Sequence, residues 1–104
     1  MGNVFQVVQI VQSPDVSQPV PAVFWNGTFY NYSDALKRQE KGVEDIVKTF
    51  TITNIDPDPH DEYDEPIDGM RLGTGLVMNA ERIEFTGYVK DYTSVYAVVC
   101  YEVK

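Results

Sequence analysis

The residue types most able to do chemistry lie together in the acidic segment of residues 56–68, whose sequence is DPDPHDEYDEPID. The segment holds seven carboxylates and no lysine or arginine. The carboxylates are Asp56, Asp58, Asp61, Glu62, Asp64, Glu65 and Asp68. The whole chain has 16 acidic and 8 basic residues and a net charge of -8, so nearly all of its excess charge belongs to this segment. A field this local indicates a directed partner more than general solubility.

A calcium site is the first chemistry that such carboxylates suggest, because Ca²⁺ binds to oxygen ligands. A helix–loop–helix calcium loop that began at Asp56 would need glycine at position 61 and glutamate at position 67. The chain has Asp61 and Ile67 there, and Pro57 and Pro59 restrict the backbone that would wrap the ion. We therefore expect no metal site in the segment.

Catalysis has little support in the sequence. His60 is the only histidine, Cys100 is the only cysteine, and no Gly-x-Ser-x-Gly nucleophile motif is present. The Gly-Thr-Gly of residues 73–75 lacks the lysine and the following helix of a phosphate-binding loop. Acid–base chemistry by a pair such as Asp61 and Asp64 would need one desolvated carboxyl, whereas mutual repulsion favours exposure. The sequence predicts no catalytic residue, no cofactor and no enzyme activity.

Two interpretations of the acidic segment remain open. In the first, carboxylates on a proline-stiffened loop engage a surface lined with lysine and arginine, and Tyr63 adds a stacking contact. In the second, the segment is a solvated connector that keeps a nearly neutral body in solution and blocks edge pairing. Two aromatic residues beside an Asn-Gly pair, Trp25 and Tyr30, are candidates for further contacts. The predicted partner-binding residues are Asp56, Asp58, Asp61, Glu62, Tyr63, Asp64, Glu65, Asp68, Trp25 and Tyr30.

The first 30 residues are predicted to form a strand, a loop and a β-hairpin. Residues 4–12 are rich in β-branched side chains and predict a strand, although glutamine at every third position interrupts its alternation. Residues 13–21 contain three prolines and predict a loop. The apolar residues on either side of Asn26-Gly27 predict a hairpin closed by a type I′ turn.

One short helix is predicted over residues 33–41. Ser33 is placed to cap its first turn, and Gly42 is placed to end it in the left-handed conformation. A longer helix is the alternative, because apolar residues recur at helical spacing up to Phe50. We prefer a break at Gly42, followed by a strand over residues 46–55.

After the acidic segment, the pattern predicts an antiparallel meander. Residues 70–78 predict a strand in which the two glycines mark a bulge or a close backbone approach. Residues 82–89 predict a second strand, residues 90–93 a turn, and residues 95–103 a central strand that is apolar on both faces.

The predicted fold class is α+β, a single domain over residues 1–104. It has one mainly antiparallel sheet of roughly five to seven strands with one short helix packed on it. Residues 56–69 form an internal connector in this domain.

Composition limits the compartment and the partner. No apolar run approaches the ~20 residues of a membrane helix, and the first residues lack the basic and apolar regions of an export signal. Together with a single free cysteine, these features predict a cytoplasmic protein that does not bind membranes. Direct binding to nucleic acid is not expected, because it needs a cationic surface.

The functional prediction is a small acidic, non-enzymatic interaction protein that docks on a basic surface of a partner protein. An inhibitor or an immunity-type accessory factor of a phage or bacterium would fit this description. One alternative is a structural subunit that assembles with copies of itself through sheet edges and aromatic residues. A second alternative is a metal-binding module.

Overall fold

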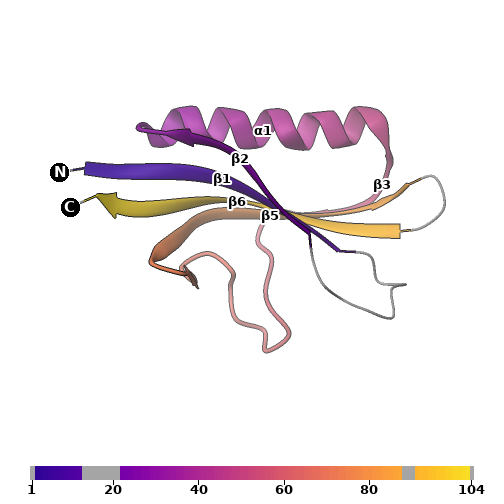
Figure 1. Cartoon of the computed structure of the whole chain (residues 1–104). Helices are drawn as coiled ribbons and strands as arrows, with labels where there is room; N and C mark the ends of the chain where they lie inside the picture. Colours follow the sequence, from indigo (N-terminus) through magenta and orange to yellow (C-terminus); the bar gives the residue numbers. More distant parts are fainter. Residues whose placement is uncertain (1, 13–21, 88–90, 104) are drawn as a thin grey trace.

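A long helix lies across an antiparallel sheet in the computed structural model, which describes residues 2–12, 22–87 and 91–103 (Figure 1). In chain order the elements are β1 (Gly2–Gln12), β2 (Ala22–Phe29), α1 (Tyr32–Thr49), β3 (Thr51–Asp56), β4 (Arg71–Leu72), β5 (Gly75–Thr86) and β6 (Asp91–Val103). The strand order is β2-β1-β6-β5-β3, and the short β4 pairs with β5 to complete a six-stranded sheet. This arrangement confirms the predicted α+β class.

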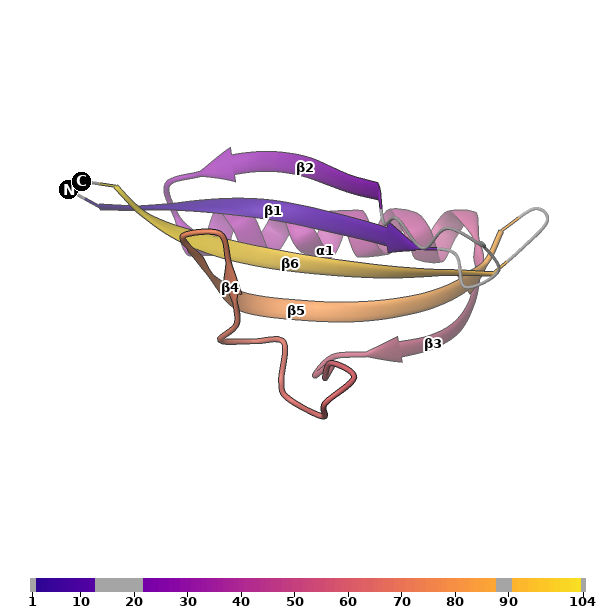
Figure 2. The same cartoon turned by 60° about the horizontal axis from the view of Figure 1, so that its bottom comes forward.

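The centre of the sheet is β6, as the apolar sequence of residues 95–103 predicts (Figure 2). It pairs with β1 from Gly2↔Val103 to Gln12↔Thr93, and with β5 along its other edge. Residues 96–99 are all buried, because elements cover both faces of the sheet at this strand.

One glutamine of β1, Gln9, is hydrogen-bonded to residues of the neighbouring strand β6. Val7 belongs to the apolar cluster on the helix side of the sheet and Val8 to the cluster on the other side, so the strand alternates regularly. Gln9 lies on the helix side, where its Nε2 donates to the Ser94 hydroxyl at 3.1 Å and its Oε1 accepts from the Tyr96 hydroxyl at 3.0 Å. This glutamine therefore satisfies polar groups of the central strand from within the sheet.

The helix α1 runs from Tyr32 to Thr49, so the predicted end at Gly42 is wrong and the longer alternative is right. Gly42 is buried in the middle of the helix, and a Cβ there would lie 2.7 Å from the ring of Tyr96. The glycine thus permits a close approach between helix and sheet and does not end the helix. The following strand begins only at Thr51, later than predicted.

The helix cap also differs from the prediction. Asn31 is the N-cap residue, and its side chain makes no capping hydrogen bond, so the predicted cap at Ser33 is wrong. The Asn31 side chain instead contacts the Asp34 carboxylate at 3.4 Å. Packing against the sheet therefore contributes more to this helix than its cap does.

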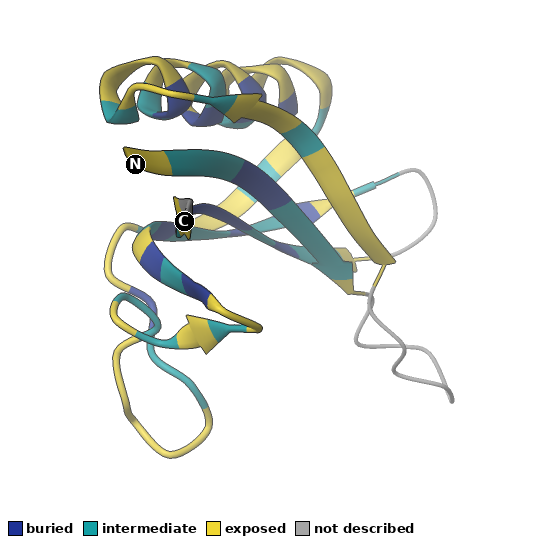
Figure 3. Cartoon of the chain, turned by 60° about the vertical axis from the view of Figure 1, so that its left-hand side comes forward, coloured by how far each residue is buried: buried dark blue, intermediate teal, exposed yellow. Residues whose placement is uncertain are grey.

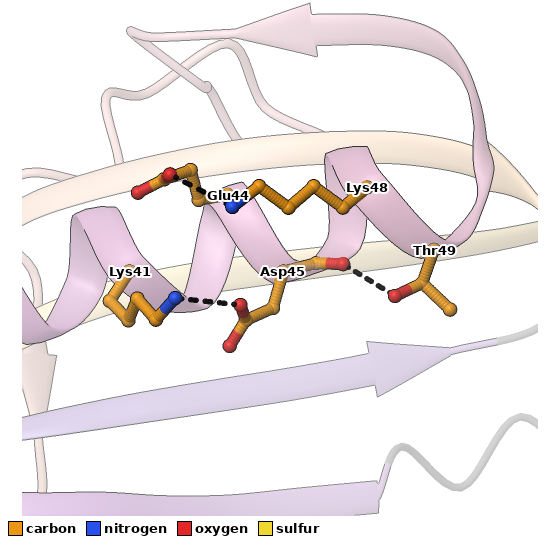
Figure 4. Close-up of polar contacts among 5 residues, drawn as sticks. All are labelled: Lys41, Glu44, Asp45, Lys48 and Thr49. Carbon is orange, nitrogen blue, oxygen red and sulfur yellow. Dashed lines mark hydrogen bonds and ion pairs between the residues drawn. The ribbon is translucent and has the colours of Figure 1, made fainter.

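The exposed side of α1 carries local polar pairs (Figure 4). Lys41 and Asp45 form an ion pair at 3.3 Å, and Lys48 and Glu44 form another at 3.4 Å. The Thr49 hydroxyl donates to the carbonyl of Asp45 at 2.7 Å. Exposed pairs of this spacing contribute about 0.3–0.5 kcal/mol each, so they support the helix without determining its position.

The Asn26-Gly27 pair lies inside β2, so the predicted hairpin at this point is wrong. The register with β1 shifts between Gln6 and Val8, where β2 contains one extra residue. Gly27 has a φ of 123°, a conformation that favours glycine. The positive φ that the Asn-Gly pair predicts is present, but it occurs at a β-bulge within a continuous strand and not in a hairpin turn.

Two apolar clusters lie on opposite sides of the sheet, which we call the helix face and the loop face (Figure 3). The helix-face cluster consists of Val7, Ala35, Ile46, Ile83, Phe85, Tyr96 and Val98. The loop-face cluster consists of Val8, Val77, Ala80, Ala97 and Val99, with Ile67 and Leu72 among the partly buried residues packed against it. The sheet is therefore covered by the helix on one side and by the chain around β4 on the other.

The C-terminal half differs from its prediction in several places. β5 is one strand of 12 residues, where two separate strands over residues 70–78 and 82–89 were expected. A Cβ at Gly75 would collide with the side chains of Val99 and Tyr101, as the expected close backbone approach requires. Gly73 has a φ of 63° and lies in the turn between β4 and β5, so the expectation is wrong for this second glycine. β6 begins at Asp91, so the turn predicted over residues 90–93 is wrong in its described part.

Two further predictions concern the loop over residues 13–21 and the absence of a membrane helix. The loop predicted over residues 13–21 lies outside the described residues. Among the residues that are described, no helix combines the length and the apolar character needed to cross a membrane.

Candidate functional site

The acidic segment leaves the end of β3 and passes over the side of the sheet opposite to α1 (Figures 1 and 2). Two apolar residues anchor it. Pro59 is fully buried, and Ile67 packs against the loop-face cluster. The segment is thus held to the protein at two points, and its charged residues lie mostly between them.

Between these anchors, the backbone folds into a small hairpin. His60 and Pro66 form an isolated antiparallel bridge, and the Ile67 amide donates to the Pro59 carbonyl at 3.0 Å. Closer to the turn, the Asp61 amide donates to the Glu65 carbonyl at 2.8 Å. The segment therefore has its own ordered backbone, which the charge pattern alone does not predict.

The turn itself is closed by a carboxylate. Asp61 Oδ1 accepts hydrogen bonds from the amides of Tyr63 and Glu65, both at 2.9 Å. Asp64 has a φ of 63°, in the left-handed region that aspartate tolerates better than most residues. Asp56 acts in the same way at the start of the segment, where its Oδ1 accepts from the Asp58 amide at 3.0 Å. Two of the seven carboxylates thus order the loop.

One basic side chain ties this hairpin to the sheet. Arg82 of β5 is the cross-strand partner of Asp56, and its Nη2 donates to the His60 carbonyl at 2.8 Å. The imidazole of His60 makes a local contact of 2.9 Å from Nδ1 to the Asp58 carbonyl. The only histidine therefore supports the geometry of the loop.

Asp68 is set apart from the other carboxylates of the segment by a buried carboxyl oxygen and a raised pKa. Burial raises the pKa of the Asp68 carboxyl above its ordinary value, the backbone amide of Ala80 lowers it to a smaller extent, and the charge of Asp58 raises it further. Its Oδ1 is buried and accepts no hydrogen bond from the described residues. Asp68 is therefore not placed as an exposed contact residue.

The predicted partner-binding residues fall into three groups. Asp58, Glu62, Asp64 and Glu65 are exposed, and Tyr63 between them is 78% exposed. Asp56, Asp61 and Asp68 are partly buried. Trp25 and Tyr30, which are 57% and 82% exposed, lie in or just after β2 at the opposite edge of the sheet.

The structure does not bring these two aromatic residues to the acidic segment. β2 and β3 are four strand steps apart, about 19 Å at the usual strand spacing. Trp25 and Tyr30 therefore belong to a different surface from the one that carries the carboxylates.

The exposed carboxylates have no internal counter-charge among the described residues. Both ion pairs found there lie on α1. In the same part of the chain, no group of three or more His, Cys, Asp or Glu side chains converges to hold a metal ion. The arrangement suits contact with an external cationic surface better than coordination of an ion.

A second site, which the sequence does not signal, lies on the helix face. A pocket of about 540 Å³ opens between the C-terminal end of α1 and the sheet. Its walls include Gln9, Phe24, Asn26, Phe50, Phe85 and Tyr92, which come from five different elements or their ends. These residues are far apart in the chain, and each one has the local pattern of a core or strand residue. No local sequence pattern could therefore have predicted the pocket.

The fold and its surfaces define a small α+β domain with an ordered acidic hairpin on one face of its sheet and an apolar pocket on the other. Comparisons with models of protein families, with curated proteins and with solved structures find no match for the chain.

Proposed function

We propose that this protein is a cytoplasmic, non-enzymatic interaction protein that docks the acidic tip, residues 61–65, onto a basic surface of a partner protein. The observation that best supports the proposal is that the tip is ordered while its outward charges are unpaired. Asp61 closes the turn through two backbone amides, whereas Glu62, Asp64 and Glu65 are exposed and form no ion pair among the described residues.

Order in the free protein favours binding, because a loop that is already folded loses less conformational entropy when it docks. Tyr63 is the natural anchor, since an exposed tyrosine can bury a large ring and still satisfy its hydroxyl. The carboxylates around it would steer a cationic partner and fix its orientation, an effect that weakens with salt.

The test is affinity capture from a lysate of the source cells at low salt, followed by titration of the captured partner. The variant neutralises only exposed carboxylates and keeps Asp61, so that the turn remains closed. It carries the substitutions Asp58→Asn, Glu62→Gln, Asp64→Asn and Glu65→Gln. We expect a stoichiometric partner for the wild-type protein, affinity that falls steeply with salt, and at least a hundredfold weaker binding by the variant, about 3 kcal/mol.

The matched control changes the same number of charges elsewhere on the surface. It carries Asp34→Asn, Glu40→Gln, Glu44→Gln and Glu102→Gln, all at exposed positions. Affinity for the partner should change by less than about threefold in this control. Equal losses in both variants, or no loss in either, would contradict docking through the acidic tip.

Self-assembly is a second candidate, favoured by the β2 edge of the sheet. Its sequence, AVFWNGTF, has none of the lysines or prolines that usually protect an edge. Val23, Phe24 and Trp25 in this strand are 48%, 50% and 57% exposed. Such an edge can pair with the same strand of a second copy and extend the sheet.

Light scattering distinguishes this candidate from the first. Self-assembly predicts a dimer for the wild-type protein and a monomer for Val23→Lys. Val47→Lys on α1 is the control, because Val47 is 46% exposed but belongs to the helix and not to the edge strand, and it should remain dimeric. A wild-type protein that stays monomeric at high concentration contradicts self-assembly and leaves docking through the acidic tip unaffected.

A further inference from the structure

The pocket on the helix face has the size and the walls of a small-molecule site. Its volume of about 540 Å³ lies within the range of about 300–1,000 Å³ that is usual for such sites. Its lining includes Ile46 and Phe50 at the C-terminal end of α1, on the helix face. The acidic segment passes over the opposite side of the sheet (Figure 1). The pocket is therefore independent of the docking surface proposed above.

One wall is a continuous run of aromatic rings. The ring centroids of Phe50 and Phe85 are 4.8 Å apart. Those of Phe85 and Tyr92 are 5.5 Å apart, with an interplanar angle of 22°. Phe24 of β2 forms part of the lining while half of its surface stays exposed. Flat rings at these spacings offer broad contact area to a planar or cyclic apolar ligand.

The floor contains a small set of polar groups. Gln9 Oε1 accepts from the Tyr96 hydroxyl at 3.0 Å and from the Asn26 amide at 3.5 Å, while Gln9 Nε2 donates to Ser94. Burial raises the pKa of the Tyr96 hydroxyl, which keeps it a hydrogen-bond donor to Gln9. Both ends of the Gln9 amide are thus hydrogen-bonded, whereas Asn26 makes only this one long contact among the described residues.

Asn26 lies two residues after Phe24 in β2, so strand alternation places both side chains on the helix face. Both residues line the pocket. The Asn26 amide therefore retains donor and acceptor capacity at the edge of an otherwise apolar cavity. A single polar group of this kind commonly orients a ligand within an apolar site.

We infer that this pocket binds a neutral, largely apolar small molecule with a planar or cyclic body and one hydroxyl, amine or carbonyl group that pairs with Asn26. Neutrality follows from the lining, because none of its described residues is Asp, Glu, Lys or Arg. A charged ligand would lose its hydration there without gaining a counter-charge.

The test is a fluorescence titration of the full-length protein with 1-aminoanthracene, a neutral three-ring amine whose emission rises in apolar surroundings. The wild-type protein should bind one equivalent with a saturable signal. Phe24→Ala removes one aromatic wall and should weaken binding about tenfold. Trp25→Ala is the matched control, because Trp25 is the next residue in β2, is exposed to a similar degree and does not line the pocket. Its affinity should change less than twofold.

A second measurement locates the probe without any substitution. Amide chemical shifts of the ¹⁵N-labelled wild-type protein should change at Gln9, Asn26 and Phe85 and stay unchanged in the acidic segment. Binding that is absent or does not saturate, equal loss in the two alanine variants, or shift changes away from the pocket would each overturn the inference.

Discussion

The two faces of the sheet are covered in different ways. On the helix face, an 18-residue helix packs apolar side chains into a cluster that contains the fully buried Ile83. On the loop face, a polar segment is held by the buried Pro59, the partly buried Ile67, one arginine and two carboxylates that accept from backbone amides. The comparison shows that a highly charged loop can be ordered without helix or strand structure. It requires that some of its carboxylates accept hydrogen bonds from the loop's own backbone amides.

The largest expected effect is a difference in stability between apolar truncations on the two faces of the sheet. Ile83→Ala opens a cavity in the helix-face core and should lower the free energy of unfolding by about 2–5 kcal/mol. Ile67→Ala removes a partly buried anchor of the loop and should cost about 1 kcal/mol, because less apolar area is lost. Chemical denaturation measures both values. A loss for Ile67→Ala as large as that for Ile83→Ala would contradict the idea that the helix face carries most of the stability.

The next effect concerns the fit of the helix. Gly42→Ala places a methyl group 2.7 Å from the ring of Tyr96, whose hydroxyl is held by Gln9. Overpacking of this kind costs about 1–3 kcal/mol, which should exceed the gain of about 1 kcal/mol in helix propensity. Lys41→Ala is the control on the exposed side of the same turn and should change stability by less than about 0.5 kcal/mol. Stabilisation by Gly42→Ala, seen as a higher midpoint in urea, would show that the close approach does not matter.

A smaller effect is confined to the acidic tip. Asp61→Ala removes the acceptor for the amides of Tyr63 and Glu65, and each lost hydrogen bond is worth about 1 kcal/mol locally. We expect faster hydrogen exchange at these amides and an almost unchanged global unfolding midpoint. Glu62→Ala removes a neighbouring charge that accepts neither bond and should leave the exchange rates unchanged. If both variants exchange alike, the carboxylate of Asp61 does not order the turn.

The smallest effect is the pH dependence contributed by Asp68. Its folded-state pKa is raised, mainly by burial, so its contribution to stability is present below the ordinary carboxyl pKa and is lost as the pH rises through the raised value. Asp68→Asn should therefore be more stable than the wild-type protein at pH 7, by less than about 1 kcal/mol because the group is partly solvated. This advantage should shrink below about pH 4, where the wild-type carboxyl is protonated.

Thermal unfolding of both proteins between pH 3 and pH 7 measures this difference, and Asp64→Asn at an exposed position of the same segment is the control. An Asp68→Asn variant that is less stable than the wild-type protein at pH 7 would mean that the carboxylate makes a favourable contact.

Local sequence patterns were sufficient for the fold class. The apolar run of residues 95–103 predicts a central strand and the β-branched residues 4–12 predict a strand, because alternation and burial leave a direct trace in residue type. The concentration of charge in residues 56–68 is likewise a property of composition. The surface position of its outward carboxylates follows, because charges without a partner stay in water.

Tertiary contacts decided the rest. Gly42 and Gly27 each signal unusual backbone freedom, but the sequence does not say whether a glycine ends a helix, makes a turn, allows a bulge or lets an element approach. The ring of Tyr96, distant in the chain, determines the role of Gly42, and the pairing of β2 with β1 determines that of Gly27. In the same way, the pocket on the helix face exists only because five separate parts of the chain meet at the end of α1. Local propensity describes what a residue permits, whereas the neighbours supplied by the fold determine which of those options is used.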